Sequence, residues 1–436
     1  LVRMVKELTR KMKDSGIEWI GEIPEDWEIR KLGNISKLYT GNSIKDNEKD
    51  NYISPINAIP YIATKDVGFD NKIDYDNGMY IKKDDGKFKR AYRGNTLVCI
   101  EGGSAGRKIA KIESEEVCFG NKLCCINSNV ISNNYLYYYS LSPNFINGFQ
   151  SRITGLIPGV TLLEMAQIEI VVPSKHKQKA IANFLDKKTQ EIDNIISKTK
   201  KAIEEYKRYK QSLITETVTK GLDENVEMKD SGIEWIGEIP EHWGLERLKY
   251  SFLEHKSKNI GNKEKNVLSL SYGNIIKRNI KDNFGLLPES FESYNIVKPG
   301  VIVLRLTDLQ NDKKSWRVGI SKQIGIITSA YVSLLNKDKN NRYSPYYYYF
   351  IHSLDYKKVF YNLGDGVRQS MSYMDIGNIE IVIPPLKEQK QIANYLDNKC
   401  SQIDQIISTK EKLLIEMEAY KKSLIYETVT GKREVE

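Results

Sequence analysis

Residues 12–27 read MKDSGIEWIGEIPEDW and residues 228–243 read MKDSGIEWIGEIPEHW, and the two stretches differ only at Asp26 versus His242. Two further segments recur 211 residues apart. QKAIANFLD begins at Gln178 and returns as QKQIANYLD from Gln389, and KQSLITETVT ahead of Lys220 returns as KKSLIYETVT ahead of Gly431. A repeat this long exceeds the roughly 20–50 residues of a solenoid unit, so the pattern predicts a duplicated domain pair.

The sequence between these repeated segments differs almost completely between the two halves. Each half is therefore a similar frame around a different insert, near residues 30–165 and 246–375. Two copies of one frame predict a pseudo-twofold molecule that presents equivalent surfaces to equivalent partners. Because the inserts are dissimilar, we expect them to do dissimilar jobs within that symmetry.

A long helix is predicted in each half. Residues 177–217 contain no Gly or Pro, and their apolar residues recur at steps of three and four, which is typical of an amphipathic helix. The same face returns in the second half. The heptad-like spacing favours packing of the two helices on each other as a coiled coil, the alternative being two helices that each lie on their own domain. The residues of this apolar stripe are Ile192, Ile196, Ile203, Tyr206, Leu213, Ile403, Ile407, Leu414, Met417 and Leu424.

The inserts are predicted to be mixed domains with many short strands. A β-branched run that ends in proline precedes each long helix, at residues 168–173 and 379–385. Strand-like runs lie within the inserts at residues 96–101 and 301–306, among Gly and Asn turns. The predicted fold class is therefore α/β, of the α+β kind, with two mixed domains and two long helices.

Tyrosine clusters occupy matching positions in the two inserts. Tyrosines occupy four of the five residues 135–139 and all of residues 346–349, and the two clusters follow Ser132 and Ser344. Serine is a preferred N-cap, so these residues are expected to cap helices whose tyrosines lie in the core. Stacking of the tyrosines on nucleic-acid bases is the alternative.

Composition excludes several broad classes of protein. The chain has 436 residues, of which 40% are hydrophobic and 28% charged, and a formal net charge of +9. No stretch approaches about eighteen consecutive apolar residues, so a membrane span is not expected. Five cysteines without a C-x-x-C pair favour reduced structural thiols over a zinc site. No secretory signal pattern follows Leu1, which favours a cytoplasmic protein.

The motifs of several enzyme classes are missing from the sequence. There is no G-x-x-x-x-G-K-[ST] phosphate loop, and the one Pro-Pro pair, Pro384-Pro385, lacks the neighbours of an amino-methyltransferase motif. No Pro-Asp dipeptide is present to begin a nuclease site, and the four histidines form no i, i+4 pair. The sequence therefore predicts a non-catalytic protein.

Each insert contains segments rich in basic and polar side chains. KKDDGKFKRAYR (82–93) carries six positive and two negative charges and GGSAGRK (102–108) follows, while the second insert has RLTDLQNDKKSWR (305–317). Glycine beside cations lets a backbone approach phosphates, and Arg, Gln and Asn match base edges. Each segment alone is equally compatible with a solvated charged loop. The predicted DNA contacts are Lys82, Lys83, Lys87, Lys89, Arg90, Ser104, Arg107, Lys108, Arg305, Thr307, Gln310, Asn311, Lys313, Lys314, Arg317, Arg368 and Gln369.

The repeated residues themselves resemble those of a known family. The diagnostic segments are GEIPEDW (21–27), GEIPEHW (237–243), PPLKEQKQIA (384–393), TDLQNDKKSWR (307–317) and IITSAY (326–331). With these segments the chain resembles, over nearly its full length, the specificity subunit of type I restriction–modification systems.

The resemblance implies two target recognition domains, each reading one half of a split, asymmetric sequence in double-stranded DNA. The two antiparallel helices would separate them as a molecular ruler, and the apolar stripe from Ile192 to Leu213 and from Ile403 to Leu424 would supply the spacer and subunit-docking residues. It also implies that two DNA adenine methyltransferase subunits dock on the frame and that restriction and translocase subunits join the assembly. S-adenosylmethionine, ATP and Mg²⁺ would then belong to those partners, so no cofactor and no metal is expected on this chain.

The repeats and the resemblance together give the expected domain boundaries. They are 12–175 for the first target recognition domain, 176–221 for the first spacer helix, 228–385 for the second domain and 386–430 for the second helix. The halves depart from each other before the repeated glutamine, where Glu388 corresponds to Lys177. This departure predicts docking sites of unequal energy.

Two other functions are compatible with parts of the pattern. A coiled-coil scaffold that organises protein partners, with incidental DNA contact, needs only the frame and the helices. An intrinsic methyltransferase would need the Asp/Asn-Pro-Pro-aromatic motif that the sequence lacks. Salt-dependent binding with a base preference would distinguish recognition from scaffolding.

Overall fold

The computed structural model describes residues 10–278, 288–309, 316–363 and 370–435. The chain forms two compact units, of which the first comprises Leu1–Thr199 with Lys412–Glu436 and the second Lys200–Glu411. The division falls inside both long helices, so each unit contains a part of each helix. The expected domain boundaries at the helix ends therefore stay a prediction.

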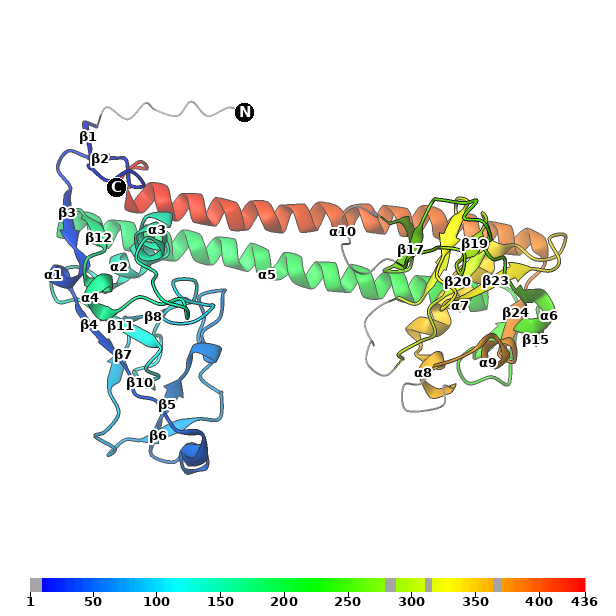
Figure 1. Ribbon diagram of the computed structural model, residues 1–436, viewed down its shortest axis with the longest axis horizontal. Coiled ribbons are helices and arrows are strands. Elements are labelled where there is room, and N and C mark those ends of the chain that lie inside the picture. The colour runs from blue at the N-terminus through cyan, green and yellow to red at the C-terminus, as the bar shows by residue number, and fades with distance from the viewer. Residues whose placement is uncertain (1–9, 279–287, 310–315, 364–369, 436) are drawn as a thin grey trace. The chain divides into compact units, whose positions relative to one another are not determined.

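The two long helices are α5 (Lys175–Lys220) and α10 (Leu386–Val429), drawn in green and red-orange in Figure 1. In the first unit Lys421 Nζ lies 2.7 Å from Asp193 Oδ1, and in the second unit Lys210 Nζ lies 2.7 Å from Asp404 Oδ2. Asp404 and Lys421 are the repeat equivalents of Asp193 and Lys210. In both ion pairs, therefore, the repeated aspartate of one helix contacts the repeated lysine of the other helix. The predicted packing of the helices on each other is confirmed within each unit.

In its described residues, the first unit contains two four-stranded sheets and two strand pairs. All ladders are antiparallel except that between β5 and β10, which is parallel. The sheets are β4 (Lys37–Thr40), β11 (Leu123–Asn127), β8 (Thr96–Cys99) and β9 (Ile109–Lys111), in that order, and β6 (Tyr80–Lys82), β5 (Ala58–Ile62), β10 (Glu116–Phe119) and β7 (Arg90–Tyr92). The pairs are β1 (Met12–Asp14) with β2 (Glu22–Pro24) and β3 (Glu28–Lys31) with β12 (Glu169–Val172).

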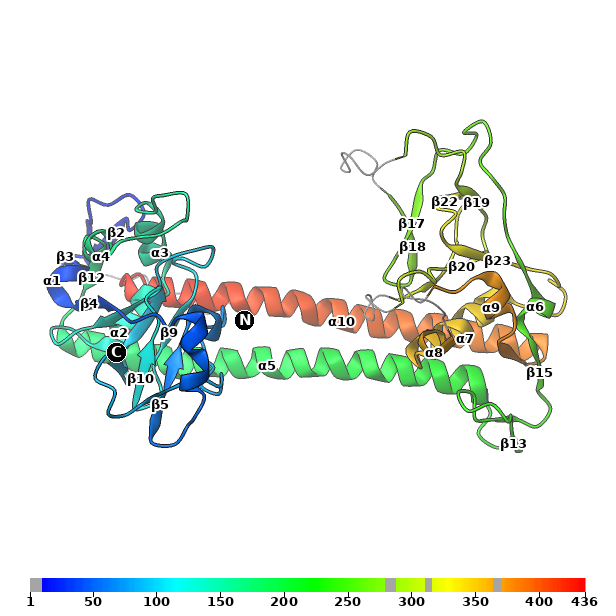
Figure 2. The ribbon, with the colours of Figure 1, turned by 60° about the horizontal axis from the view of Figure 1, so that its bottom comes forward.

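The second unit repeats this frame on different residues. The predicted strand before α10 is β24 (Glu380–Ile383), which pairs with β15 (Gly244–Arg247), as β12 pairs with β3. A four-stranded sheet runs β16 (Phe252–Glu254), β23 (Val332–Asn336), β20 (Ile302–Leu304) and β21 (Val318–Ile320), and is seen beside α7 in Figure 2. The remaining pairs are β13 (Met228–Asp230) with β14 (Glu238–Pro240), β17 (Leu268–Ser271) with β18 (Asn274–Lys277), and β19 (Asn295–Val297) with β22 (Gly325–Ile327).

Short helices complete both units. In the first they are α1 (Leu32–Ile35), α2 (Asn133–Ser140), α3 (Pro143–Gln150) and α4 (Leu162–Ala166), with 3-10 turns η1 (Asp46–Tyr52) and η2 (Thr64–Asp66). In the second they are α6 (Leu248–Ser251), α7 (Ser344–Tyr356), α8 (Val359–Leu363) and α9 (Tyr373–Gly377). No helix among the described residues is long and apolar enough to cross a membrane.

The tyrosine clusters open α2 and α7 and lie in the cores. Tyr135 and Tyr346 are fully buried, so the alternative of base stacking is wrong for them. Ser132 caps α2 as predicted, because its side chain accepts a hydrogen bond from the Tyr135 amide. The predicted cap at Ser344 is wrong, because Ser344 is the first residue of α7 and the N-cap position is occupied by Tyr343, whose side chain makes no capping hydrogen bond. The Tyr343 amide donates to Gln389 Oε1.

Candidate functional site

The repeated glutamines organise the start of each tyrosine helix. Gln178 Oε1 accepts a hydrogen bond from the Ser132 amide at 2.8 Å, and Gln389 Oε1 accepts one from the Tyr343 amide at 2.8 Å. Each glutamine also donates from Nε2 to a proline carbonyl, Pro173 in one unit and Pro384 in the other. Both side chains are buried, so the repeat retains a buried polar group whose partners are all main-chain.

Each tyrosine helix also closes the end of a long helix from the other half of the sequence. Tyr135 Oη donates to the Val429 carbonyl at 3.1 Å, and Tyr346 Oη donates to the Val218 carbonyl at 2.8 Å. The last carbonyls of a helix have no partner within it, so these bonds satisfy two that would otherwise be orphaned. The halves of the sequence are thereby interlocked inside each unit.

The repeated tryptophans pack on the glycines that follow the long helices. Gly221 (φ +82°) approaches Trp243 so closely that a Cβ there would lie 3.2 Å from the ring, and Gly431 (φ +74°) stands in the same relation to Trp27. A left-handed glycine is the usual residue after a helix end. We call the assembly of helix end, glycine and GEIPE-x-W segment the helix-end junction, and each unit has one.

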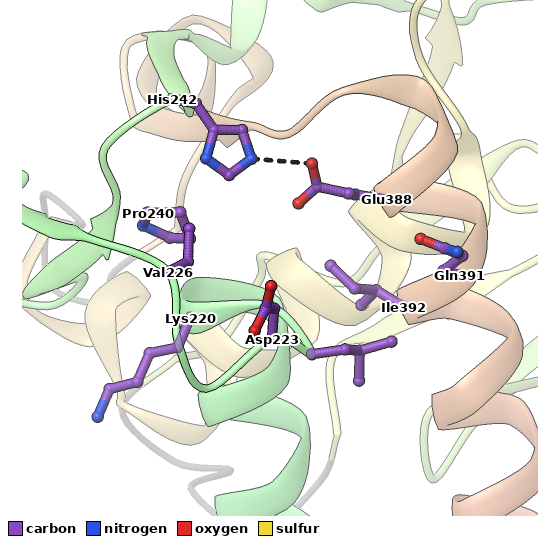
Figure 3. Close-up of a pocket in the computed structure, with 10 residues that line it drawn as sticks. Lys220, Asp223, Val226, Pro240, His242, Glu388, Gln391 and Ile392 are labelled. Atoms are coloured by element: carbon purple, nitrogen blue, oxygen red, sulfur yellow. Dashed lines mark hydrogen bonds and ion pairs between the residues drawn. The ribbon is translucent and has the colours of Figure 1, made fainter.

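The two helix-end junctions differ in charge. In the second, His242 Nε2 lies 2.8 Å from Glu388 Oε1 and Trp243 Nε1 donates to Glu388 Oε2 at 2.9 Å, as Figure 3 shows for the histidine. This junction borders a cavity of about 640 Å³ lined by Lys220, Gly221, Leu222, Asp223, Val226, Pro240, His242, Glu388, Gln391 and Ile392.

In the first junction a lysine takes the place of Glu388. Asp26, the equivalent of His242, pairs with Arg10 at 2.7 Å, and Lys177 donates instead to the Val435 carbonyl at 2.8 Å. The buried Nε1 of Trp27 has no partner among the described residues. His242 in place of Asp26 and Glu388 in place of Lys177 are far apart in the sequence, but both changes lie in the same helix-end junction. Both differences are visible in the sequence, but nothing in the sequence indicates that His242 and Glu388 are in contact.

The basic segment of the first insert lies on its surface. Lys82, Lys83, Lys87 and Lys89 are exposed. Arg90 is half-buried and pairs with Glu116 at 3.0 Å across β7 and β10, and it also donates to the Lys83 carbonyl. The four lysines are therefore available to a polyanion, whereas Arg90 fastens two strands together.

The glycine-rich segment forms a loop after β8, and we call residues 101–108 the glycine loop. Arg107 is exposed, and Ser104 and Lys108 are half-buried. The Arg107 guanidinium and the Lys108 ammonium lie 5.1 and 5.2 Å from the ring centre of Phe69, which is 60% exposed. Sequence reasoning missed Phe69, and a lone aromatic in the polar stretch VGFDN was the only signal for it.

Arg317 of the second insert is not a surface residue, and the prediction that it contacts DNA is wrong. Its side chain is fully buried and donates to the carbonyls of Arg305 and Thr307, at 3.1 and 2.9 Å. A guanidinium has five donors in a fixed fork, so it is suited to tying irregular main chain together. Arg305 and Thr307 are half-buried. The other predicted contacts of this insert, Gln310, Asn311, Lys313, Lys314, Arg368 and Gln369, lie outside the described residues.

The predicted spacer residues all face inward to some degree. Four are buried, namely Ile192, Ile203, Ile403 and Leu424, and the other six are half-buried. Ile192 and Leu424 join the core of the first unit. The half-buried members leave part of the stripe open to solvent, so their role in subunit docking stays a prediction.

The described residues contain no group of three or more His, Cys, Asp or Glu side chains placed to hold a metal ion. All five cysteines are buried. Burial raises the pKa of Cys118 to about 12 and that of Cys400 to about 11, so both are protonated thiols at neutral pH. The features of the described residues that suit binding are therefore the exposed basic loops of the first insert, which are carried by the repeated frame.

Sequence comparison identifies relatives of this chain. The model of the family described as the type I restriction modification DNA specificity domain matches residues 24–205 and 317–418. The MjaX and MjaVIII specificity subunits of type I restriction enzymes from Methanocaldococcus jannaschii are each 28% identical to this chain. The alignments cover 95% of both chains for the former, and 94% of this chain and 93% of the relative for the latter.

Solved structures show the same fold at low sequence identity. A chain from a study of complex assembly and conformational transition of the type I R-M system is similar with a TM-score of 0.67 at 14% identity, over 94% of this chain and 99% of that chain. The HsdS subunit of Thermoanaerobacter tengcongensis is similar with a TM-score of 0.52 at 16% identity, over 94% and 98%. The resemblance indicated by the repeated motifs is confirmed, and the chain belongs to the family of type I restriction–modification DNA specificity domains.

Proposed function

We propose that this chain is the specificity subunit that brings methyltransferase and restriction subunits to a bipartite DNA target, with each insert reading one half-site. The observation that carries the proposal is one frame built twice around two different inserts, the first of which carries exposed basic loops. Phosphate contacts position a protein on DNA, and contacts to base edges give specificity. A duplicated frame with unlike inserts suits an asymmetric, split target.

The frame surfaces are the proposed docking sites for two DNA adenine methyltransferase subunits. The helix-end junctions support this assignment because they are repeated structures that the inserts do not require. The charge difference between Glu388 and Lys177 supports unequal binding of the two copies. Restriction and translocase subunits would join the same assembly, which acts on DNA in the cytoplasm.

The chain itself is proposed to be non-catalytic. The sequence lacks phosphate-loop and amino-methyltransferase motifs, and its cysteines are buried thiols. Methyl transfer, ATP hydrolysis and Mg²⁺-dependent cleavage would then be performed by the partners, which would bind S-adenosylmethionine, ATP and the metal. The part of this chain is to choose the sequence on which they act.

Methylome sequencing tests the proposal directly. A host that lacks adenine methylation would express the methyltransferase partner with this chain or without it. We expect a methylated motif of two short half-sites separated by an unread spacer, only when both proteins are present. Methylation that does not depend on this chain, or that has no sequence preference, would leave a scaffold as the better description.

A further inference from the structure

The first insert presents two large apolar side chains to solvent on a defined turn. Residues 154–158, between α3 and α4, are all exposed. Leu156 is 106% exposed and Ile157 is 64% exposed. The Thr154 amide closes the turn by donating to the Gly159 carbonyl at 3.1 Å. We call residues 154–159 the apolar turn.

The apolar turn is fastened to the glycine loop. The Gly102 amide donates to the Pro158 carbonyl at 2.8 Å, and the Val160 amide donates to the Ile100 carbonyl at 2.9 Å. A Cβ on Gly159 would lie 3.3 Å from the Ile100 carbonyl oxygen, so the close approach favours glycine. Because both ends of the turn are held, its backbone has little conformational entropy left to lose on binding.

The surface beside the turn is positively charged. Arg107 and Lys108 follow in the glycine loop, and neither forms an ion pair with the residues that the structure describes. Lys108 is oriented by a 2.9 Å hydrogen bond to the Thr64 carbonyl. The one acid of the loop, Glu101, pairs with Lys122 at 2.9 Å. The combination of exposed aliphatic side chains with cations that form no ion pair in the described part of the chain matches a polyanion that also offers apolar surface.

We propose that the apolar turn is a wedge that enters the DNA of the first half-site. Leu156 and Ile157 would lie against an unstacked base step, with Arg107 and Lys108 on flanking phosphates. Proteins that deform DNA insert such aliphatic side chains between base steps and repay the unstacking with added contact. The inference rests on the proposed function, and it names the residues that act on the duplex.

The chemistry of methylation gives such a wedge a role. A base must leave the stack before its exocyclic nitrogen is methylated, and unstacking costs free energy. A wedge supplied by the recognition subunit lowers that cost at the first half-site. In the second unit the Met371 amide donates to the Leu306 carbonyl at 2.9 Å, as Val160 does to Ile100. The residues ahead of it, 364–369, lie outside the described residues and read GDGVRQ, so the apolar pair belongs to the first half.

The test uses the full complex of this chain with its methyltransferase subunits and a duplex carrying the methylated motif. The duplex has 2-aminopurine beside the target base of one half-site or the other, and affinity is measured over a range of salt concentrations. The variants are Leu156→Ser with Ile157→Ser, and Arg107→Ala with Lys108→Ala. Leu163→Ser, at an 81% exposed leucine on α4, is the matched control.

The apolar double variant is expected to lose affinity about tenfold or more, the value of burying one leucine side chain, with an unchanged salt slope. It should also lose the 2-aminopurine signal at the first half-site and keep it at the second. The cationic double variant should reduce the salt slope by about 1 to 2. The control should behave as the wild type.

Three results would overturn the wedge. If the apolar variant binds and unstacks DNA like the wild type, the turn does not enter the duplex. If gel filtration shows that it fails to retain methyltransferase subunits, the turn is a protein-docking surface. If the wild-type complex has no sequence preference at all, the proposed function fails and the wedge fails with it. This result is distinct from the first two, which contradict the wedge and leave the proposed function in place.

Discussion

Trp243 donates a 2.9 Å hydrogen bond from Nε1 to Glu388 Oε2, and the equivalent Nε1 of Trp27 has no partner in the described part of the first unit. The indole of Trp243 is almost fully buried. Removing an acceptor from a buried donor costs about 1 to 3 kcal/mol. The glutamate that distinguishes the second half therefore stabilises its helix-end junction.

Glu388→Ala should lower the free energy of unfolding by about 1 to 3 kcal/mol, because the Trp243 Nε1–H is then buried without an acceptor. Urea unfolding followed by tryptophan fluorescence measures the loss. Glu241→Ala, at an exposed glutamate within the same junction, is the control and should change stability little. An equal loss for both variants would show that the hydrogen bond to Trp243 is not what matters.

Arg317→Ala should lower the free energy of unfolding by about 3 kcal/mol or more, since the carbonyls of Arg305 and Thr307 lose their partner inside the protein. Arg317→Lys should not restore it, because an ammonium lacks the fork geometry. Exposed Arg247→Ala is the control. The account of Arg317 as a core residue is contradicted if stability is unchanged while the salt slope of DNA binding falls.

The free energy of unfolding should decrease at acidic pH because His352 is buried in its neutral form. Burial lowers the pKa of this imidazole from 6.5 to about 4, so the folded protein holds it neutral. Above pH 6.5 its contribution to stability is complete. Below pH 6.5 the imidazole becomes protonated in the unfolded state but stays neutral in the folded state. The contribution of about 3 kcal/mol to the free energy of unfolding is therefore lost as the pH falls toward 4.

Unfolding free energies measured between pH 7.5 and 4 check this prediction. The difference between wild type and His352→Phe should shrink progressively below pH 6.5. Exposed His176→Phe should leave the pH profile of the wild type in place. A constant difference across the range would mean that His352 is not held neutral.

Helix length should set the distance between the half-sites. Adding seven residues to both α5 and α10, near Thr199 and Lys412, lengthens each by about 10 Å at 1.5 Å per residue. The methylated motif should then gain about three base pairs of unread spacer, at 3.4 Å per base pair. The same insertion in α5 alone displaces Lys210 from Asp404 while Asp193 stays beside Lys421, and should abolish specific methylation. An unchanged spacer in the chain with both helices extended would show that helix length does not set the distance between the half-sites.

Periodicity and repetition revealed the frame. The three- and four-residue spacing located α5 and α10 to within a few residues, and the β-branched runs located β12 and β24. The sheets of the inserts were less accessible, because most of their strands have three or four residues and cannot be distinguished from loops by alternation. That both inserts place a four-stranded antiparallel sheet at the same point of the frame was not predicted.

Charge density located exposed basic residues in the first insert, while most of the contacts that it predicts in the second insert lie outside the described residues. Lys82 and Arg107 are exposed as a DNA contact requires, whereas Arg317 uses its charge inside the protein. A basic residue in a polar run has the same sequence signature in both situations. Leu156 and Ile157 carried no signal, because aliphatic residues are usually buried and only the fold shows that these two are not.

Replacing residues 246–375 by residues 30–165 of the same chain tests the central claim most directly, with the methylated motif read by methylome sequencing. Both frames would then carry the first insert, and the pseudo-twofold frame should impose its symmetry on the target. We predict a split motif whose two half-sites are the first half-site and its inverted repeat. A motif identical to that of the wild type, or one in which the first half-site has also changed, would contradict the account.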